Sequence, residues 1–238
     1  MMRFGAALFI MMIGLPLRAD RLPPLLMFPA PLAPDLASLP RIAGSDPVAV
    51  KINQALKQEE ENILLDRQKC LAEPNSDFAA WSNVTMNGPE FLSIWQSRDF
   101  SCGGPHPDNA QFVLLFDLKT GEALDPYTLL PREMRPDKPK LGRYPGDETS
   151  FILFRPLQNL YTSRAVLDPL MPEECLDIFA NDRWMRFLLW PDAKAHALII
   201  QPHGLAHAEA YCAEALPVPL DVLRQLHAPL RLIDALAR

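Results

Sequence analysis

One short corner constrains this chain more than any other stretch of its sequence. Residues 101–107 contain a cysteine, two adjacent glycines, two prolines and a histidine. Adjacent glycines permit positive φ angles, and each proline fixes φ and removes a backbone hydrogen-bond donor. A continuing strand cannot accommodate such a segment, so we predict a shaped turn here. Apolar runs at 91–102 and 112–118 flank it and are typical of buried strands.

These two strands belong to a predicted antiparallel meander. We expect a further strand at 78–86, because the tripeptide Asn87-Gly88-Pro89 that follows it favours a turn into the 91–102 strand. The segment 117–122 favours a hairpin turn after the third strand. Since side chains alternate between the two faces of a strand, four apolar residues share one face: Leu92, Ile94, Phe100 and Cys102.

A long helix is predicted before the meander. Asp46 is a suitable N-cap, and Pro47 suits the first helical position. Apolar residues then recur at helical spacing as far as Cys70, which places this cysteine on the buried face: Val48, Ile52, Leu56, Ile63 and Cys70. The run Glu59-Glu60-Glu61 is expected to form a solvated face rather than a metal site.

Proline marks the segments outside the first meander. Residues 20–44 carry six prolines, which excludes a helix and predicts an extended leader whose end can pair as an edge strand. Residues 125–146 are rich in proline and charge and are expected to form a long surface connection. The second half is predicted to contain helices at 151–161, 172–179 and 219–226 and strands at 184–190, 196–201 and 208–213.

Together these elements predict an α+β fold of antiparallel β-meanders with helices packed against the sheet, stapled by disulfides. The expected organisation is a signal peptide at 1–19, a proline-rich leader at 20–44, an α+β domain at 45–226 and a C-terminal tail at 227–238. The domain is expected to be single, built either as one body or as two lobes joined by 125–146. With 238 residues, 49% of them hydrophobic, the chain is long enough for a sizeable core.

The N-terminus has the layout of a secretory signal. Arg3 precedes an apolar run from Phe4 to Leu17, and we expect cleavage after the small residue Ala19. The run is shorter than the roughly 20 residues that a membrane span needs. We therefore expect a periplasmic or secreted protein with no membrane span after signal removal. The alternative is that the apolar run is retained as a membrane anchor.

Charge limits the classes of partner. The net charge of −6 becomes −8 when Arg3 and Arg18 leave with the signal. Nucleic acid is excluded as an expected partner, because its binding needs a basic surface. An acidic exported protein can attract a cationic one, although the same charge also simply keeps a protein soluble.

Four cysteines are expected to form two disulfides in an oxidising compartment. Three pairings are open to them. We favour Cys70 with Cys102 and Cys175 with Cys212, because each bond then staples one half of the chain. In the chain-entropy model each such loop is worth about 3–4 kcal/mol. No two of these cysteines form a CxxC motif, so redox catalysis is not expected.

Four motifs in one order resemble a known family: Ile52-Asn53-Gln54-Ala55-Leu56, Cys102-Gly103-Gly104-Pro105-His106-Pro107, Phe116-Asp117-Leu118-Lys119-Thr120-Gly121 and Val218-Pro219-Leu220-Asp221-Val222-Leu223. Over residues 41–226 the chain resembles the export-associated domain of lysozyme-sensing anti-sigma factors, which also accompanies some peptidoglycan deacetylases. The resemblance implies an α+β fold and a cell-envelope role. Two departures are Ser101-Cys102, where the family has an aromatic residue before the glycines, and the segment 202–207, where it often has Pro-Tyr and later glycines.

Histidines supply the candidate chemical groups. His106 beside Gly103 and Gly104 is an accessible candidate ligand or general base, or a residue that holds the corner by hydrogen-bonding the backbone. His203 and His207 have the i, i+4 spacing of two zinc ligands on a helix, a spacing that also resembles the second motif of polysaccharide deacetylases. Pro202 and Gly204 argue against a helix there, and Leu118 replaces the second aspartate of the deacetylase motif.

The sequence therefore predicts a non-catalytic, exported cell-envelope domain that recognises a wall-associated protein of lysozyme type or a glycan such as peptidoglycan. Its candidate surface is the corner of Cys102, Gly103, Gly104 and His106, and no cofactor is expected. The alternative is a zinc-dependent hydrolase or deacetylase of envelope polysaccharide that uses His203 and His207.

Overall fold

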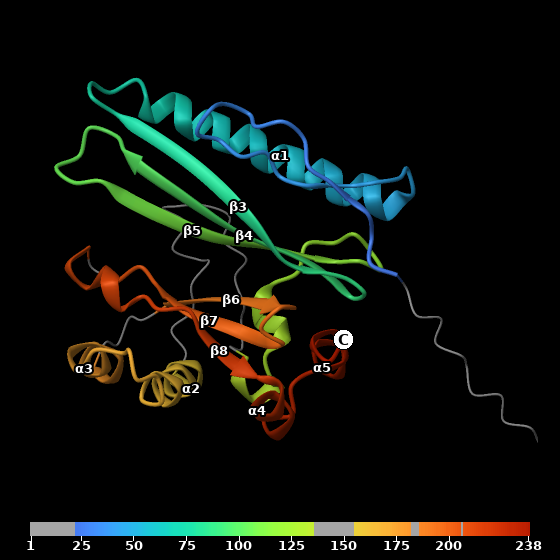
Figure 1. The fold of residues 1–238 in the computed structure, drawn as a ribbon, viewed down its shortest axis with the longest axis vertical. Coiled ribbons are helices and arrows are strands. Elements are labelled where there is room, and N and C mark those ends of the chain that lie inside the picture. The colour runs from blue at the N-terminus through green and yellow to red at the C-terminus, as the bar shows by residue number, and fades with distance from the viewer. Residues whose placement is uncertain (1–21, 136–154, 182–185, 206) are drawn as a thin grey trace, which may run out of the picture.

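The computed structural model describes residues 22–135, 155–181, 186–205 and 207–238 of the 238-residue chain. The predicted signal peptide lies outside this part. Two three-stranded antiparallel sheets form the centre of the molecule, with helices on the outer side of each sheet (Figure 1). The predicted α+β fold with two meanders is thus confirmed. The first sheet contains β3 (Asp77–Asn87), β4 (Phe91–Ser101) and β5 (Asp108–Asp117), and the second contains β6 (Arg186–Asp192), β7 (Ala197–His203) and β8 (Leu216–Pro219).

The long helix α1 (Pro47–Cys70) covers the outer face of the first sheet (Figure 1). Asp46 caps it, because its side chain accepts hydrogen bonds from the backbone N–H groups of Val48 and Ala49 at 3.0 and 3.1 Å. The predicted stripe is buried and packs on the even-numbered side of β4, where each fully buried side chain contributes about 1.5–3 kcal/mol: Ile52 and Leu56 of the helix meet Leu92 and Ile94 of the strand.

The acidic run in α1 is not the solvated face that we predicted. Glu60 is buried and pairs with Arg41 of the leader. Glu59 pairs with Arg98, a buried guanidinium on β4. Only Glu61 of the three is exposed. The prediction was wrong because the two arginines lie far away in sequence and meet the helix only through tertiary packing.

The proline-rich leader is extended, as predicted, and packs along the first sheet. Leu36 lies opposite Ala80 of β3 in a parallel bridge, and the Ala37 N–H donates to the Ala80 carbonyl at 2.9 Å. A single bridge at Leu36 therefore joins the leader to the edge strand β3. The leader also forms a small ribbon of its own, in which β1 (Leu26–Met27) pairs with β2 (Arg41–Ile42).

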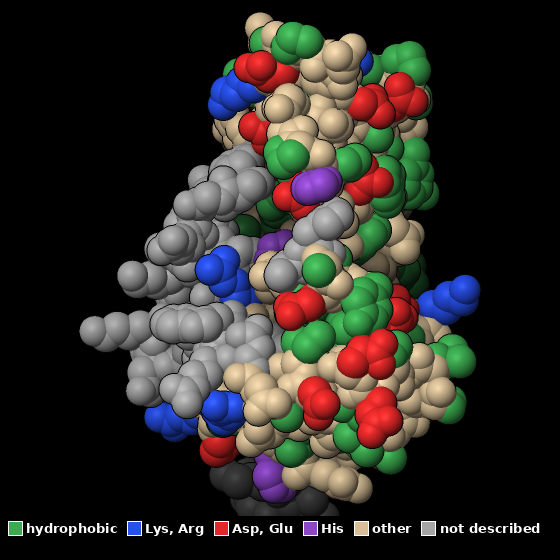
Figure 2. Space-filling view, turned by 90° about the vertical axis from the view of Figure 1, so that its left-hand side faces the viewer, with side chains coloured by type: hydrophobic (Ala, Val, Ile, Leu, Met, Phe, Trp, Pro, Cys, Tyr) green, Lys and Arg blue, Asp and Glu red, His purple; other side chains and the backbone are tan. Residues whose placement is uncertain are grey.

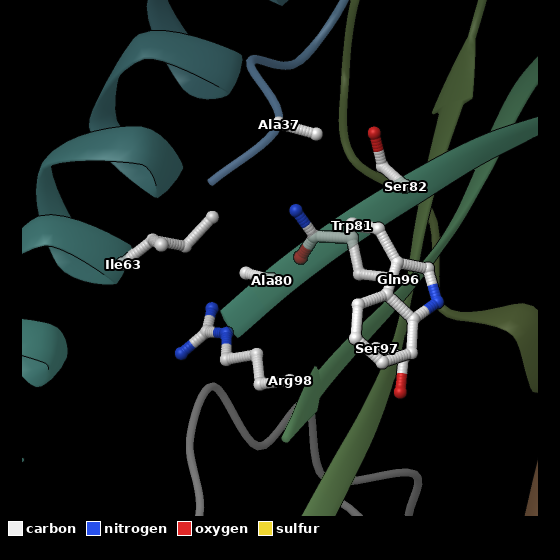
Figure 3. A pocket seen from close by; sticks show the side chains of 8 residues that line it. All are labelled: Ala37, Ile63, Ala80, Trp81, Ser82, Gln96, Ser97 and Arg98. Atoms are coloured by element: carbon white, nitrogen blue, oxygen red, sulfur yellow. The ribbon is translucent and has the colours of Figure 1, made fainter. Parts of the chain in front are cut away.

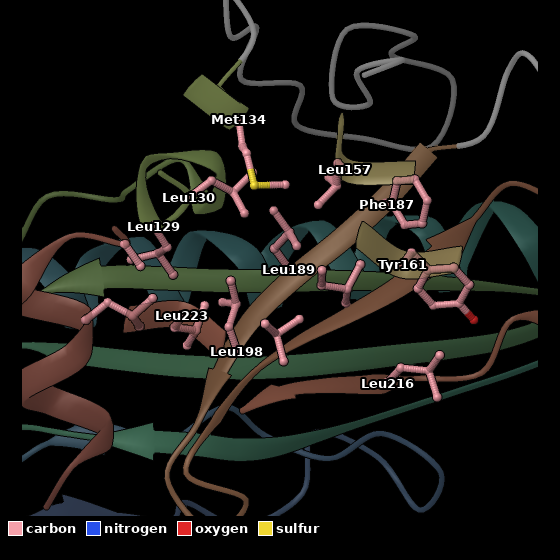
Figure 4. Close-up of a cluster of buried hydrophobic side chains, with 14 of the residues drawn as sticks. Leu129, Leu130, Met134, Leu157, Tyr161, Phe187, Leu189, Leu198, Leu216 and Leu223 are labelled. Carbon is pink, nitrogen blue, oxygen red and sulfur yellow. The ribbon is translucent and has the colours of Figure 1, made fainter. Parts of the chain in front are cut away.

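The second sheet is buried on both faces. Between the sheets, Trp190 and Ile199 pack in one apolar cluster with Trp95 of β4. On the other side, a larger cluster joins the sheet to the helices (Figure 4). The helices concerned are α2 (Arg155–Ala165), α3 (Glu173–Asn181), α4 (Leu220–Gln225) and α5 (Leu230–Leu236). Helices α2, α3 and α4 and strands β6 and β7 lie within a few residues of their predicted positions, and α5 lies in the predicted C-terminal tail. Residues 151–154 and 184–185 of the predicted elements lie outside the described part.

The third strand of this sheet is not where we predicted it. Residues 207–212 form the 3-10 helix η3 (His207–Cys212), and β8 follows after it. Pro217 and Pro219 concealed the strand, because proline argues against a central strand. β8 accommodates them because it lies at the edge of the sheet.

The described part of the predicted surface connection, residues 125–135, enters the core instead. Its two 3-10 turns are η1 (Pro126–Leu129) and η2 (Arg132–Met134), and Tyr127 donates its hydroxyl to the carbonyl of Phe187 at 3.0 Å. The prolines here shape short turns whose apolar side chains point inward, so proline content alone was misleading. Residues 136–146 lie outside the described part.

The C-terminal segment is anchored to the body of the protein. Leu232, Ile233 and Leu236 of α5 are buried in the large cluster. Arg231 reaches the first sheet, where Glu90 accepts a hydrogen bond from its Nε at 2.8 Å and Asp117 accepts one from its Nη1 at 2.9 Å. None of the described helices has the length and apolar character that crossing a membrane requires.

Candidate functional site

Both favoured disulfides are present in the structure. Cys70–Cys102 joins the end of α1 to the corner after β4, with the two Cα atoms 4.6 Å apart. Cys175–Cys212 joins α3 to η3, with a Cα separation of 5.5 Å. One bond therefore lies in each half of the chain, and the first of them holds the base of the corner.

The corner is exposed above this anchored base. Cys102 is half-buried, whereas Gly103, Gly104 and His106 are exposed. Gly103 has a φ of +79°, and a Cβ atom at this position would lie only 3.2 Å from the Cβ of Glu73. The left-handed backbone and the close neighbour both require glycine, as the sequence suggested.

The corner shares one end of the molecule with the chain that follows β7. Both lie at the left of Figure 1, where β4 and β7 end. Figure 2 looks onto this end and shows acidic and histidine side chains spread over it. Hydrophobic side chains lie between these polar ones in the same view.

His203 lies at the last position of β7, directly opposite Arg186 at the start of β6. It is half-buried, and burial followed by the positive charge of Arg186 lowers the pKa of His203 to about 4. The imidazole is therefore neutral near pH 7. A neutral imidazole can bind a metal ion, but the charge that disfavours a second proton on the ring also disfavours a metal cation beside it.

The two candidate zinc ligands do not share a helix. His203 ends a strand, Gly204 follows with a φ of +73°, and His207 begins η3. The described residues bring together no group of three metal-binding side chains. The i, i+4 spacing thus does not give the helical geometry on which the zinc interpretation depended.

Toward the same end, the facing surfaces of the two sheets become polar. On β4, Trp95 belongs to the apolar cluster between the sheets, and Ser97 and Asp99 follow it on the same side of the strand. On β7, Ile199 belongs to that cluster and Gln201 follows it on the same side. Burial raises the pKa of Asp99. Sequence analysis missed this surface, although the polar odd-numbered positions of β4 are visible in the sequence.

Two buried polar atoms in this region have no hydrogen-bond partner among the described residues, namely Nε1 of Trp95 and Oε1 of Gln201. The amide nitrogen of Gln201 is satisfied, since it donates to the carbonyl of Ala213 at 2.9 Å. Buried polar groups are nearly always paired, so an orphan donor and an orphan acceptor in one region are notable.

A hollow on the opposite face of the first sheet is structural. Arg98, Gln96 and Ile63 line it together with Ala37 of the leader (Figure 3). Its Arg98 guanidinium donates to Asp66 at 2.7 Å and to Glu59 at 2.5 Å, and the hollow is too narrow for a water molecule. The hollow is therefore part of a buried ion network and leaves no space for a bound molecule.

Comparison with known proteins gives the fold. No protein-family model matches the sequence, and a search of curated proteins finds no match. A crystal structure of a DUF3298 family protein from Pseudomonas aeruginosa PAO1 has a TM-score of 0.50 and 13% identity, over 81% of this chain and 84% of that chain. The chain therefore shares its fold with a protein of an uncharacterised-domain family. A member of the same family from Bacteroides fragilis NCTC 9343 has a TM-score of 0.42 and 13% identity, over 81% of this chain and 74% of that one.

Proposed function

We propose that this protein is an exported, non-catalytic binding domain of the cell envelope. In this proposal the signal is removed after Ala19, and residues 45–226 form the binding domain between the leader and the tail. Two disulfides support export, because such bonds persist in oxidising compartments. The four ordered motifs that resemble the domain of lysozyme-sensing anti-sigma factors support an envelope role.

The observation that carries the proposal is an exposed corner on a fixed base. The Cys70–Cys102 bond holds one end of the corner, and Gly103 packs closely against Glu73. A loop held in one conformation loses little entropy when it binds a partner, and therefore binds more tightly than a loose loop. The corner around Gly104 and His106 is thus the proposed contact for a wall-associated protein of lysozyme type or for a glycan.

The test measures binding of the purified, oxidised protein to immobilised lysozyme and to isolated peptidoglycan. His106→Asn is expected to weaken binding to one of the two by about tenfold. His227→Asn is the matched control, because His227 is also exposed but lies in the turn between α4 and α5. If His106→Asn and His227→Asn bind equally well, or if neither ligand binds the unaltered protein, the proposal fails.

A zinc-dependent polysaccharide hydrolase is the second candidate, and the neutral imidazole of His203 is the observation in its favour. Arg186 opposite this ring weighs against it. Metal content decides between the two functions: the hydrolase requires stoichiometric zinc that is lost in His203→Ala with His207→Ala, together with an activity on envelope polysaccharide. The binding proposal expects the double variant to retain its binding to the wall.

A further inference from the structure

The inner face of the first sheet, toward the end that carries the corner, combines one aromatic side chain with several polar ones. In the strand register Trp81 lies beside Ser97, which lies beside Gln111, and Asp99 lies beside Asn109 in the next row. Residues that are opposite each other on neighbouring strands point to the same side of the sheet, about 4.5–5.5 Å apart. One aromatic side chain and four small polar ones therefore share this face.

Trp81 is the most accessible tryptophan in the described part of the chain. Its exposed fraction is 42%, whereas Trp190 is buried and Trp95 is half-buried. Figure 3 shows its indole on the far side of the sheet from Gln96 and close to Ser97. A large indole left open to solvent beside polar groups offers a flat apolar plane on which a sugar ring can stack through its C–H bonds.

The side chains around Trp81 are hydrogen-bonding groups, and none of them is a cation. Asp99 and Asn109 are exposed and Gln111 is half-buried, so a carboxylate and two amides are within reach of a ligand. No lysine or arginine occupies this face of β3, β4 or β5 in the register that the structure describes. Planar carboxylate and amide groups can bond two neighbouring hydroxyls at once, whereas an anionic ligand would need cations here.

We propose that this face binds a neutral stretch of an oligosaccharide, with a sugar ring on Trp81 and its hydroxyls on Asp99, Asn109 and Gln111. This rests on the proposed envelope function, of which it names the ligand class. The same face is separate from the corner residues, so the two sites can be tested apart.

The experiment titrates the full, oxidised protein with soluble oligomers of N-acetylglucosamine, followed by calorimetry and by tryptophan fluorescence. Trp81→Ala is expected to weaken binding by about tenfold, as truncation of an aromatic anchor does, and Trp81→Phe to recover part of the loss. Phe28→Ala is the control, since Phe28 is also an exposed aromatic residue, in the leader. Thermal unfolding checks that Trp81→Ala is still folded.

Lack of oligomer binding by the unaltered protein, or equal binding by Trp81→Ala, would overturn the inference. If Trp81→Ala instead weakened the binding of an extended peptide by the same factor, and the sugar oligomers did not bind, the face would be a peptide site. That result would also overturn the inference. The proposed function is judged separately, by the His106→Asn effect on lysozyme and peptidoglycan. It survives if that effect remains while sugar binding is absent.

Discussion

The two halves of the molecule are held together by different kinds of interaction. In the first half, α1 meets its sheet through apolar clusters and also through buried ions, where Arg98 pairs with Glu59 and Asp66. In the second half, the helices meet their sheet through one large apolar cluster in which Tyr161 and Phe179 pack edge to face, with centroids 4.9 Å apart. Each half has a single disulfide at the same end of the molecule.

The two halves have similar topology, but different interactions stabilise them. A buried apolar cluster loses stability in proportion to the contacts removed from it. A buried ion network loses most when one partner is removed and the others remain, because uncompensated charges are then left out of water. The halves should therefore respond differently to substitutions of single residues and of whole networks.

The largest effect is expected from Phe179→Ala in the second half. Phe179 is fully buried against Tyr161, so truncation leaves a cavity and should cost about 3–5 kcal/mol of unfolding free energy. Urea denaturation monitored by circular dichroism measures the cost. Phe28→Ala, at an exposed phenylalanine, should change the free energy by less than about 0.5 kcal/mol. Equal effects of the two changes would contradict the account of this core.

The next effect is expected from Arg98→Met in the first half. The change leaves Glu59 and Asp66 near the sheet without their cation, and should cost about 2–3 kcal/mol, since both carboxylates retain some exposure to water. Adding Glu59→Gln and Asp66→Asn to Arg98→Met should recover part of the lost unfolding free energy, because the unpaired charges are then removed. In the apolar half, a second substitution should not recover the free energy lost in Phe179→Ala. A triple variant that is no more stable than Arg98→Met alone would contradict the charge argument.

The sequence predicted what is local and missed what depends on packing between distant segments. The helix stripe ending at Cys70 and the corner at Gly103 follow from spacing and backbone freedom, and the Cys70–Cys102 disulfide joins these two local elements. The inward turn of Tyr127 was missed, because proline signals a break in regular structure without saying which side faces the core. The surface around Trp81 was missed because it depends on the register of three neighbouring strands, which the sequence does not show.

The contact between the halves gives a smaller, pH-dependent effect. Burial alone would raise the pKa of Glu90 and of Asp117, but hydrogen bonds and charges from Arg231, and from Lys119 at Glu90, outweigh it and lower the pKa of each carboxyl below its ordinary value of 4.5 or 3.8. A carboxyl whose pKa is lower in the folded state stabilises the fold above its unfolded pKa, and this contribution is lost as the pH falls through the folded pKa.

Arg231→Gln should therefore cost about 1 kcal/mol at neutral pH, because the arginine is partly exposed, and less below pH 4. Chemical denaturation at several pH values measures the difference from the unaltered protein. Arg224→Gln is the control, on an exposed arginine of α4. A cost that is the same at pH 3 and pH 7 would contradict the role of the two carboxyls.

The last effect, at His203, develops only below neutral pH and tests whether charge contributes as little to the second half as the comparison of the two halves suggests. Burial and Arg186 lower the pKa of His203 from 6.5 to about 4, so the unfolded chain takes up a proton at a higher pH than the folded protein does. The sign follows from this difference: His203 makes the protein less stable as the pH falls from 6.5 toward 4, and adds no further change below that. His203→Asn should therefore reduce the slope of stability against pH in this window. The reduction is compared with that of the control His227→Asn, at an exposed site. Titration of the His203 imidazole by NMR provides the direct check. A value near 6.5 would mean that the ring is not held away from water beside Arg186, and that the polar end of the second sheet is more open than its described contacts imply.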